Sequence, residues 1–337
     1  MERFQLRPYH SSDVQEIVDV INAASLREPG FPRAVVDAVG NIRHQRYVSL
    51  DSEKVVAIND QNKIVGYAYL TDRENGIVME TGGAVHSSYW GQGIGQILLA
   101  WAEEQARVLS KQAPGGVRTV LQINLFESET TAIQLFSDAG YFKVREWMHM
   151  ELVMHEPFPT PSLPDGLIIR EMDLNNDWDI VGPAMDDAYS DHWGAILLPE
   201  NAEEAQGNED DNDETEMPTD HSFSNAPGYC FVVLDGGFVA GGILCNAKLV
   251  ERNDTGRVGS VFVRGAYRRQ RIGQALMKTA LNSFFSNGVK RIILDTDSES
   301  FSETIQFYSA LGMKLYRREF LFEKEIRAGR EVRRLAL

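Results

Sequence analysis

Two stretches of the chain match each other and decide the fold: VHSSYWGQGIGQILL at residues 85–99 and VRGAYRRQRIGQALM at residues 263–277. They align without gaps, with Val85 matched to Val263 and Gly95 to Gly273. A second matching pair follows in the same order, TAIQLFSDAGY at residues 131–141 and ETIQFYSALGM at residues 303–313, at a slightly shorter offset. Two paired blocks in the same order indicate that one domain occurs twice in the chain.

The apolar patterns around these blocks predict the same order of elements in both halves: a strand, a helix, three strands, a helix, a strand, a helix and a last strand region. The helices that follow the glycine-bearing turns are amphipathic. The expected ranges are strands 4–7, 54–59, 63–70, 77–85, 117–124 and 141–154 with helices 14–21, 93–109 and 130–138 in the first half, and strands 167–171, 229–234, 238–249, 256–263, 289–295 and 313–325 with helices 177–190, 272–286 and 302–310 in the second.

Two irregular stretches separate these patterns. Residues 155–166 hold four prolines and no apolar periodicity, which is typical of a linker. We therefore expect an N-terminal domain at 1–155, a linker at 156–166 and a C-terminal domain at 167–328. Residues 200–227 are acidic and poor in apolar residues, so we expect a solvated loop there.

Composition excludes several classes of protein. The chain has 337 residues, 43% of them hydrophobic, and its longest apolar runs are too short to span a membrane. Its net charge of -16 argues against nucleic-acid binding, and residues 171–247 contain no Lys or Arg but 18 acidic residues. Two cysteines and the absence of a leader sequence favour the cytoplasm. We expect no metal, and a monomer rather than a dimer.

The turn before each amphipathic helix has a physical meaning. The first N–H groups of a helix have no partner within it, and glycines allow a phosphate to approach them closely. The spacing of Gly91, Gly93 and Gly95 fits neither the P-loop nor the dinucleotide fingerprint. From these residues alone, a phosphate site and a tight turn both stay open.

The whole pattern resembles one family. A strand ending in Val, then Gly-Ile-Gly-x-x-Leu, then Ala-x-x-x-Phe/Tyr-x-x-x-Gly further along the same half, is similar to the GNAT superfamily of acyl-CoA-dependent N-acyltransferases. The resemblance covers nearly the whole chain, in a tandem layout like that of mycothiol synthases. It implies an α/β (α+β) fold of two GNAT domains, each a mixed central sheet flanked by helices.

The resemblance also implies which residues bind acetyl-CoA, the expected co-substrate. Trp90 stands where the family has Gln or Arg, and Arg271 stands where it has the first glycine, so each half departs once. Whether Arg271 crowds the phosphates or contacts them stays open. The implied residues are Val85, Gly91, Gln92, Gly93, Ile94 and Gly95 in the first half, and Val263, Arg268, Arg269, Gln270, Arg271, Ile272 and Gly273 in the second.

In the family, a tyrosine of the later helix protonates the departing CoA thiolate. Tyr308 holds that position in the second half, whereas the first half has Phe136, which cannot donate a proton. We therefore expect the chemistry in the second half. The amine attacks directly in a ternary complex, since no nucleophilic Cys or Ser constellation is evident.

The general base and the acceptor are less fixed. Glu80 is placed where several family members keep a base, and Asp295, Asp297, Asp191 and His192 are substitutes in the second half. We expect Asp191, His192 and Trp193 to bind the acceptor, a small primary amine whose positive charge would suit the acidic loop. The alternative is an acyl-CoA-binding sensor without catalysis. At the level of single residues, His192 and Trp193 would also suit loop packing on the helix, and Asp295 and Asp297 would also suit capping of the next helix.

Overall fold

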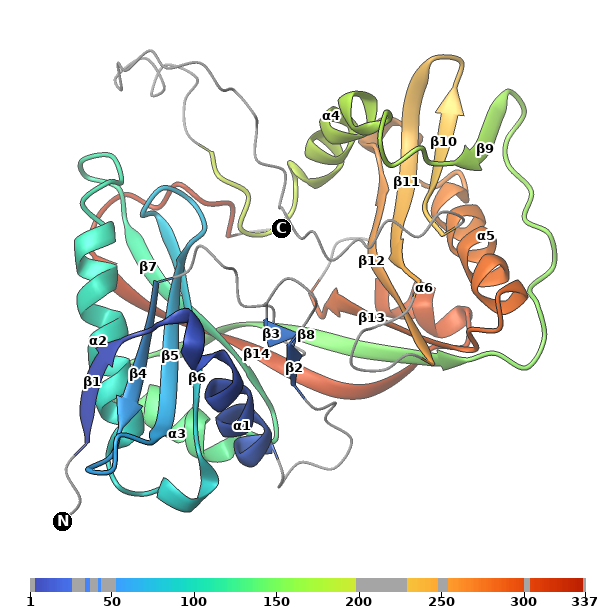
Figure 1. Cartoon of the computed structure of the whole chain (residues 1–337). Helices are drawn as coiled ribbons and strands as arrows, with labels where there is room; N and C mark the ends of the chain where they lie inside the picture. Colours follow the sequence, from blue (N-terminus) through green and yellow to red (C-terminus); the bar gives the residue numbers. More distant parts are fainter. Residues whose placement is uncertain are drawn as a thin grey trace. The chain divides into compact units, whose positions relative to one another are not determined.

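The elements of both halves follow the order that the sequence repeat predicts. The computed structural model describes residues 4–25, 34–36, 42–43, 53–197, 229–247, 254–299 and 304–335, so the acidic loop expected at 200–227 lies outside the described residues. Two compact units divide the chain (Figure 1): unit 1 is Met1–Trp147 with Arg317–Glu331, and unit 2 is Met148–Tyr316 with Val332–Leu337.

Unit 1 is built on a mixed sheet in the order β1-β4-β5-β6-β7-β14. Its neighbours are antiparallel except for the parallel pair β6 and β7. The elements of this repeat are β1 Gln5–Pro8, η1 Ser11–Asp13, α1 Val14–Ser25, β2 Val35–Val36, β3 Ile42–Arg43, β4 Glu53–Ile58, β5 Ile64–Asp72, β6 Val78–Val85, η2 Ser87–Tyr89, α2 Ile94–Leu109, β7 Thr119–Phe126, α3 Thr130–Asp138 and β8 Phe142–Val153.

Unit 2 repeats this plan in the order β9-β10-β11-β12-β13-β8. Again the first four strands are antiparallel, and β12 and β13 are parallel. The elements of this repeat are β9 Leu167–Glu171, α4 Trp178–Tyr189, β10 Phe231–Asp235, β11 Phe238–Asn246, β12 Thr255–Val263, η4 Gly265–Tyr267, α5 Ile272–Ser286, β13 Arg291–Asp297, α6 Thr304–Ala310 and β14 Lys314–Arg327.

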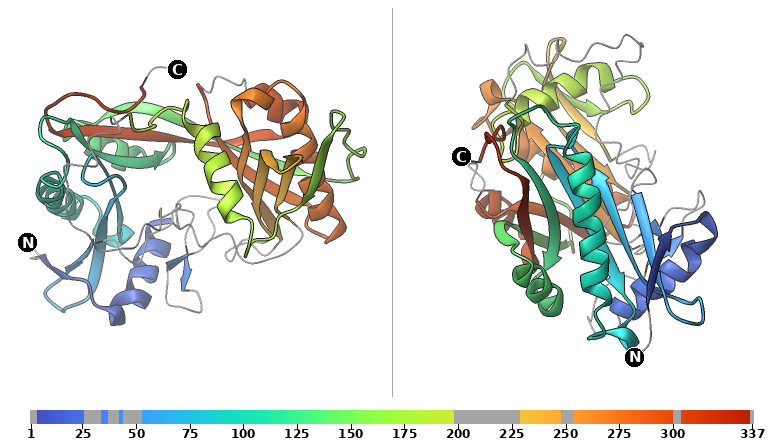
Figure 2. Two further views of the ribbon diagram at one scale, coloured as in Figure 1. Left: turned by 90° about the horizontal axis from the view of Figure 1, so that it is seen from above. Right: turned by 90° about the vertical axis from the view of Figure 1, so that its left-hand side faces the viewer.

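Helices cover both faces of each sheet because alternate strand residues point to opposite faces. In unit 1, Val56 packs in the cluster of α1, while its neighbours Val55 and Ala57 pack with α2. Figure 2 shows α2 lying along the strands of this sheet. In unit 2, α4 and α5 belong to separate apolar clusters in the same way.

Much of the last strand of each repeat lies in the other unit: residues 148–153 of β8 belong to unit 2, and residues 317–327 of β14 belong to unit 1. Met150 and Leu152 of β8 pack in the core of unit 2, and Phe322 of β14 packs in the core of unit 1. The expected boundary at residues 155–156 separates the sequence repeats, and residues 154–166 contain no helix or strand. The compact units nevertheless exchange one strand in each direction.

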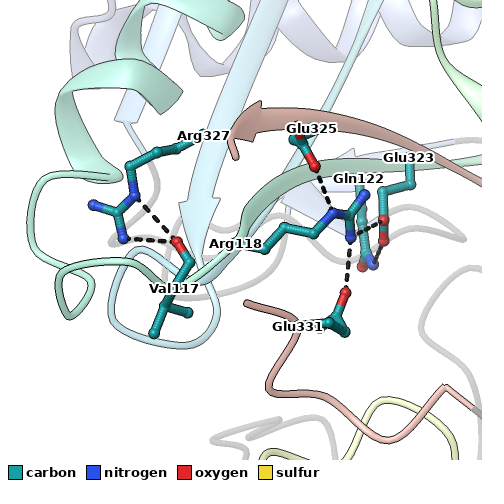
Figure 3. Close-up of polar contacts among 7 residues, drawn as sticks. All are labelled: Val117, Arg118, Gln122, Glu323, Glu325, Arg327 and Glu331. Carbon is teal, nitrogen blue, oxygen red and sulfur yellow. Dashed lines mark hydrogen bonds and ion pairs between the residues drawn. The ribbon is translucent and has the colours of Figure 1, made fainter. Parts of the chain in front are cut away.

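A cluster of ion pairs and hydrogen bonds links the exchanged strand β14 to β7 and the residues just before it (Figure 3). Arg118, just before β7, contacts Glu323, Glu325 and Glu331 at 2.8–2.9 Å, and Gln122 of β7 donates to Glu323 at 2.8 Å. Beside them, the Arg327 guanidinium donates to the Val117 carbonyl at 3.0 Å. Glu323 is only 2% exposed, so its charge depends on these partners.

Candidate active site

The turn between the fourth main strand and its helix has the same backbone in both units. In unit 1, Gly91 and Gly93 have φ of 77° and 86°, and Gly93 caps α2. A Cβ on either glycine would meet no atom within 4 Å, so the left-handed φ is what requires glycine there. In unit 2, Arg269 and Arg271 adopt φ of 64° at the same positions, and Arg271 caps α5.

Left-handed backbone is unfavourable for residues that carry a Cβ, by about 1–2 kcal/mol each. Unit 2 therefore holds two arginines in a conformation that glycine would adopt freely. Both side chains are exposed, and neither has a hydrogen-bond or ion-pair partner among the described residues. Their guanidinium groups are available at the N-terminus of α5, where backbone N–H groups already favour an anion.

The residue just before this turn, Trp90 in unit 1 and Arg268 in unit 2, forms a hydrogen bond to the end of the preceding strand. The Trp90 indole donates to the Val85 carbonyl at 2.6 Å, and Arg268 Nε donates to the Val263 carbonyl at 3.2 Å. The Arg268 guanidinium also binds both oxygens of Asp191, at 2.5 and 3.0 Å.

This bidentate hydrogen bonding to Arg268 lowers the pKa of Asp191. His192 Nδ1 lies 3.1 Å from the Asp191 carboxylate, and its ring packs edge-on against Tyr189. The structure thus brings together Asp191, His192 and Arg268. Their roles toward an acceptor or acetyl-CoA stay predictions.

The parallel strands separate soon after they meet in both units. Pairing of β6 with β7 covers Val78–Glu80, although β6 continues to Val85. Pairing of β12 with β13 covers Thr255–Arg257, although β12 continues to Val263. The far halves of β6 and β12, which lead into the helix turns, are thus left without a parallel neighbour among the described strands.

Only β12 carries a β-bulge in this region. Leu244 of β11 is opposite Ser260 and Cys245 is opposite Val258, so Gly259 is an extra residue. Pairing of β5 with β6 runs without interruption. A bulge leaves its extra residue outside the regular ladder, and bulges occur often beside active sites.

Tyr308 of α6 lies in the core of unit 2 and is 8% exposed. Burial raises the pKa of its phenol, and Tyr189 and Asp295 nearby raise it further, so the hydroxyl is protonated at neutral pH. The Tyr189 hydroxyl lies 2.6 Å from Ser260 Oγ, directly after the bulge. In unit 1 the matching residue is Phe136, which packs edge-on against Tyr141.

Asp295 of β13 is an ionised carboxylate beside Tyr308. Burial would raise its pKa, but the charges of Arg257 and His149 and a hydrogen bond from Arg257 outweigh that and lower it. Arg257 NH2 lies 2.8 Å from the carboxylate, which keeps 38% of its side chain exposed.

The expected base of the first half has a different counterpart. Glu80 pairs with Arg73 at 3.0 Å and is opposite Thr71 in β5. The equivalent residue of β12, opposite Asn246 in β11, is Arg257, because the extra Gly259 shifts the count by one. Unit 2 therefore has an arginine where unit 1 has a carboxylate.

Sequence reasoning missed part of this cluster. It did not single out Tyr189, Ser260, His149 or Arg257 as site residues. A gapless alignment of the two repeats makes no allowance for the extra residue Gly259, so it does not match Arg257 with Glu80. His149 could have been found from the second pair of matching blocks. When their alignment is continued into the last strands, His149 of the first repeat is matched with Leu321 of the second.

The family can now be stated. The acetyltransferase (GNAT) family model matches residues 21–141 and 189–313, one match for each repeat. The chain belongs to the GNAT family of acetyltransferases and is an N-acetyltransferase with two tandem GNAT-fold domains. The part of the chain that the structure describes has no helix long and apolar enough to cross a membrane.

The most informative relatives are similar over most of their length. The chain is 27% identical over 255 residues to the mycothiol acetyltransferase of Salinispora arenicola, with 74% of each chain covered. It is 23% identical over 284 residues to the mycothiol acetyltransferase of Thermobispora bispora, which covers 83% of this chain and 86% of that one.

Solved structures agree on the fold. A GCN5-related N-acetyltransferase from Sphaerobacter thermophilus has a TM-score of 0.75 and 25% identity, with 97% of both chains covered. A tandem GNAT protein from the clavulanic acid biosynthesis pathway has a TM-score of 0.69 and 16% identity, covering 97% of this chain and 100% of that chain.

Proposed function

We propose that the protein transfers an acetyl group from acetyl-CoA to the primary amine of a small molecule, and that unit 2 performs the chemistry. One contrast carries this assignment. Tyr308 gives unit 2 a protonated phenol close to Tyr189 and Asp295, whereas Phe136 gives unit 1 no proton donor. The bulge at Gly259 supports the same choice.

The donor set at the α5 turn fits a phosphorylated co-substrate. Arg269 and Arg271 supply two exposed positive charges, and the first N–H groups of α5 supply hydrogen-bond donors. Val263, Gln270, Ile272 and Gly273 complete the turn. In unit 1 the glycines at 91, 93 and 95, with Val85, Gln92 and Ile94, form a second turn of the same shape that is a candidate for donor binding without turnover.

The reaction needs two proton transfers. The amine nitrogen forms a bond to the acetyl carbonyl carbon, and the carbon–sulfur bond of the thioester breaks. The Tyr308 hydroxyl gives its proton to the departing thiolate, whose thiol has an ordinary pKa of about 8.5. The amine loses a proton to a base in unit 2. Among the candidates that the sequence suggested, Asp295 lies close enough to Tyr308 for its charge to raise the pKa of the phenol.

The acceptor belongs to the small molecules. The mycothiol acetyltransferases among the relatives make unacetylated mycothiol the first compound to test. An aminosugar and a polyamine follow, because residues 171–247 carry no positive charge to repel a cationic amine.

Calorimetric titration with acetyl-CoA, followed by mass detection of acetylated glucosamine, spermidine and mycothiol, tests the proposal. We expect one or two acetyl-CoA sites per chain and one acetylated product, and Tyr308→Phe should keep binding but lose turnover. Binding without transfer to any amine would favour the sensor alternative. Absence of binding at millimolar acetyl-CoA would overturn the proposal.

A further inference from the structure

The first repeat places a strand beside the proposed site of unit 2. Strand β8 neighbours β13 in that sheet. The Met154 amide donates to the Lys290 carbonyl at 2.8 Å, and Glu151 forms an ion pair with Arg291. Counting backward along β8 therefore corresponds to counting forward along β13, which is the register of an antiparallel pair.

This register places His149 opposite Asp295, since His149 precedes Met154 by as many residues as Asp295 follows Lys290. Side chains directly opposite in an antiparallel pair share one face, with Cβ atoms about 4.5–5.5 Å apart. Unit 1 has the same geometry, where Leu321 of β14 is opposite Asn124 of β7. Unit 2 thus has a histidine and an aspartate where unit 1 has a leucine and an asparagine.

The surroundings suit a proton acceptor. The half-buried His149 ring packs edge-on against Tyr316 at 6.2 Å on its β14 side, and Asp295 with its partner Arg257 faces it from β13. On β8 itself, the Glu151 charge is neutralised by Arg291. Asp295 is therefore a charged group that faces His149 across the strand pair, and the two side chains interact electrostatically.

Asp295 is itself a poor base. Burial would raise its pKa, but the charge of Arg257 and its hydrogen bond outweigh that and hold the pKa below the ordinary value, so Asp295 is a weak proton acceptor at neutral pH. An imidazole has an ordinary pKa of about 6.5, which is much better matched to accepting a proton near neutrality. A carboxylate beside a histidine orients the ring and stabilises its charged form, as in catalytic triads.

We propose that His149, carried by the exchanged strand β8, is the general base of acetyl transfer in unit 2, with Asp295 as its positioning residue. This inference rests on the proposed function. The amine nitrogen bonds to the carbonyl carbon and gives one proton to an imidazole nitrogen of His149. Tyr308 protonates the departing sulfur, and the phenolate and imidazolium return to their resting states through solvent.

The site therefore needs both sequence repeats. The acid Tyr308 comes from the second repeat, while the base His149 comes from the first. This arrangement explains why β12 can carry Arg257 at the position where unit 1 has Glu80. The arginine keeps Asp295 ionised, and the base stands on the other side of that carboxylate.

The test compares wild type, His149→Gln, Asp295→Asn and the control His155→Gln, an exposed histidine just beyond β8. Steady-state acetylation of the responsive amine is measured from pH 5.5 to 10, together with acetyl-CoA affinity and melting temperature. We expect His149→Gln to lower kcat about 10²–10⁴-fold and to change the shape of the pH profile of kcat. Its activity should rise with pH as the amine itself deprotonates.

A second readout does not depend on turnover. Imidazole signals that vanish from the ¹H–¹³C spectrum of His149→Gln identify His149, and they should shift when the responsive amine is added with CoA, whereas those of His155 should not. Asp295→Asn should lower kcat in the same direction but less, with unchanged acetyl-CoA affinity.

The outcomes separate this inference from the proposed function. If wild type acetylates an amine and folded His149→Gln keeps kcat within threefold and the same pH profile, the inference is overturned and the proposed function stands. If wild type binds acetyl-CoA but acetylates no amine in the panel, the proposed function is overturned and this inference with it.

Discussion

Units 1 and 2 share a strand order and a turn geometry, yet they differ at the positions that we propose to bind the phosphates or to support proton transfer. The paired residues, unit 1 first, are Gly91 and Arg269, Gly93 and Arg271, Glu80 and Arg257, Asn124 and Asp295, Phe136 and Tyr308, and Leu321 and His149. Backbone shape is common to both units, whereas proton donors and acceptors gather in unit 2. Fold alone therefore does not locate the chemistry.

Loss of the Tyr308 hydroxyl tests this comparison most severely. Tyr308→Phe should lower kcat by about 10²–10⁴-fold, because the thiolate then leaves without its acid. Acetyl-CoA affinity measured by calorimetry should not change. Tyr229→Phe, a buried tyrosine of the same core cluster, is the matched control. Full activity of Tyr308→Phe would move the chemistry out of unit 2.

The two exchanged strands should differ in how firmly they are held. Arg118→Ala should lower the free energy of unfolding by about 3 kcal/mol, because the buried Glu323 charge loses its main partner. Arg291→Ala should cost about 1 kcal/mol or less, since Arg291 and Glu151 are each 33% exposed. Urea denaturation measures both, and equal losses would contradict the difference between the strands.

The turn of unit 2 can be converted to that of unit 1. Arg269→Gly with Arg271→Gly should weaken acetyl-CoA binding about tenfold, since two charged donors are lost. The free energy of unfolding should change by less than about 1 kcal/mol, because relief of left-handed strain offsets the added freedom of the unfolded chain.

The double lysine variant Arg269→Lys with Arg271→Lys keeps the charge and the strain. It should bind acetyl-CoA more tightly than the double glycine variant in calorimetry. Equal affinities would mean that these side chains do not contact the phosphates.

A repeated ion pair offers the smallest difference. Arg7 binds Asp13 and Arg170 binds Asp177 in matching turns, and hydrogen bonding to the arginine lowers the pKa of each carboxyl. A folded pKa below the unfolded value gives stability that is present above about pH 4 and is lost as pH falls through the folded pKa.

Asp13→Asn and Asp177→Asn should each cost about 1–2 kcal/mol at pH 7. The difference from wild type should shrink in urea melts repeated at decreasing acid pH. A loss that is independent of pH would show that packing, rather than the ion pair, sets the effect.

Much of the fold and part of the candidate site could be predicted from the sequence. The remaining features could not, for physical reasons. The repeat predicts the order of elements and the position of the turn, because apolar period and glycine spacing are local properties. The contrast of Phe136 with Tyr308 is visible in the same way. The bulge at Gly259 is set by pairing with β11, so no local pattern reports it.

The exchange of β8 and β14 between the units also could not be predicted from the sequence. Both strands have apolar residues that would suit either sheet, and the chain alone does not say which sheet receives them. His149 was therefore not singled out from the sequence. Its position opposite Asp295 depends on pairing between strands that are far apart in the sequence.

The exchange of strands also constrains how the protein is made. Arg118 and Glu323 are 205 residues apart, yet both belong to unit 1. A nascent chain that has released only its first half lacks β14, and β7 then presents an unpaired edge to other chains. Vectorial synthesis therefore cannot complete the sheet of unit 1 until β14 has left the ribosome. Until then the N-terminal half lacks one strand of its sheet and is prone to aggregate. It should therefore need a chaperone more than the C-terminal half does.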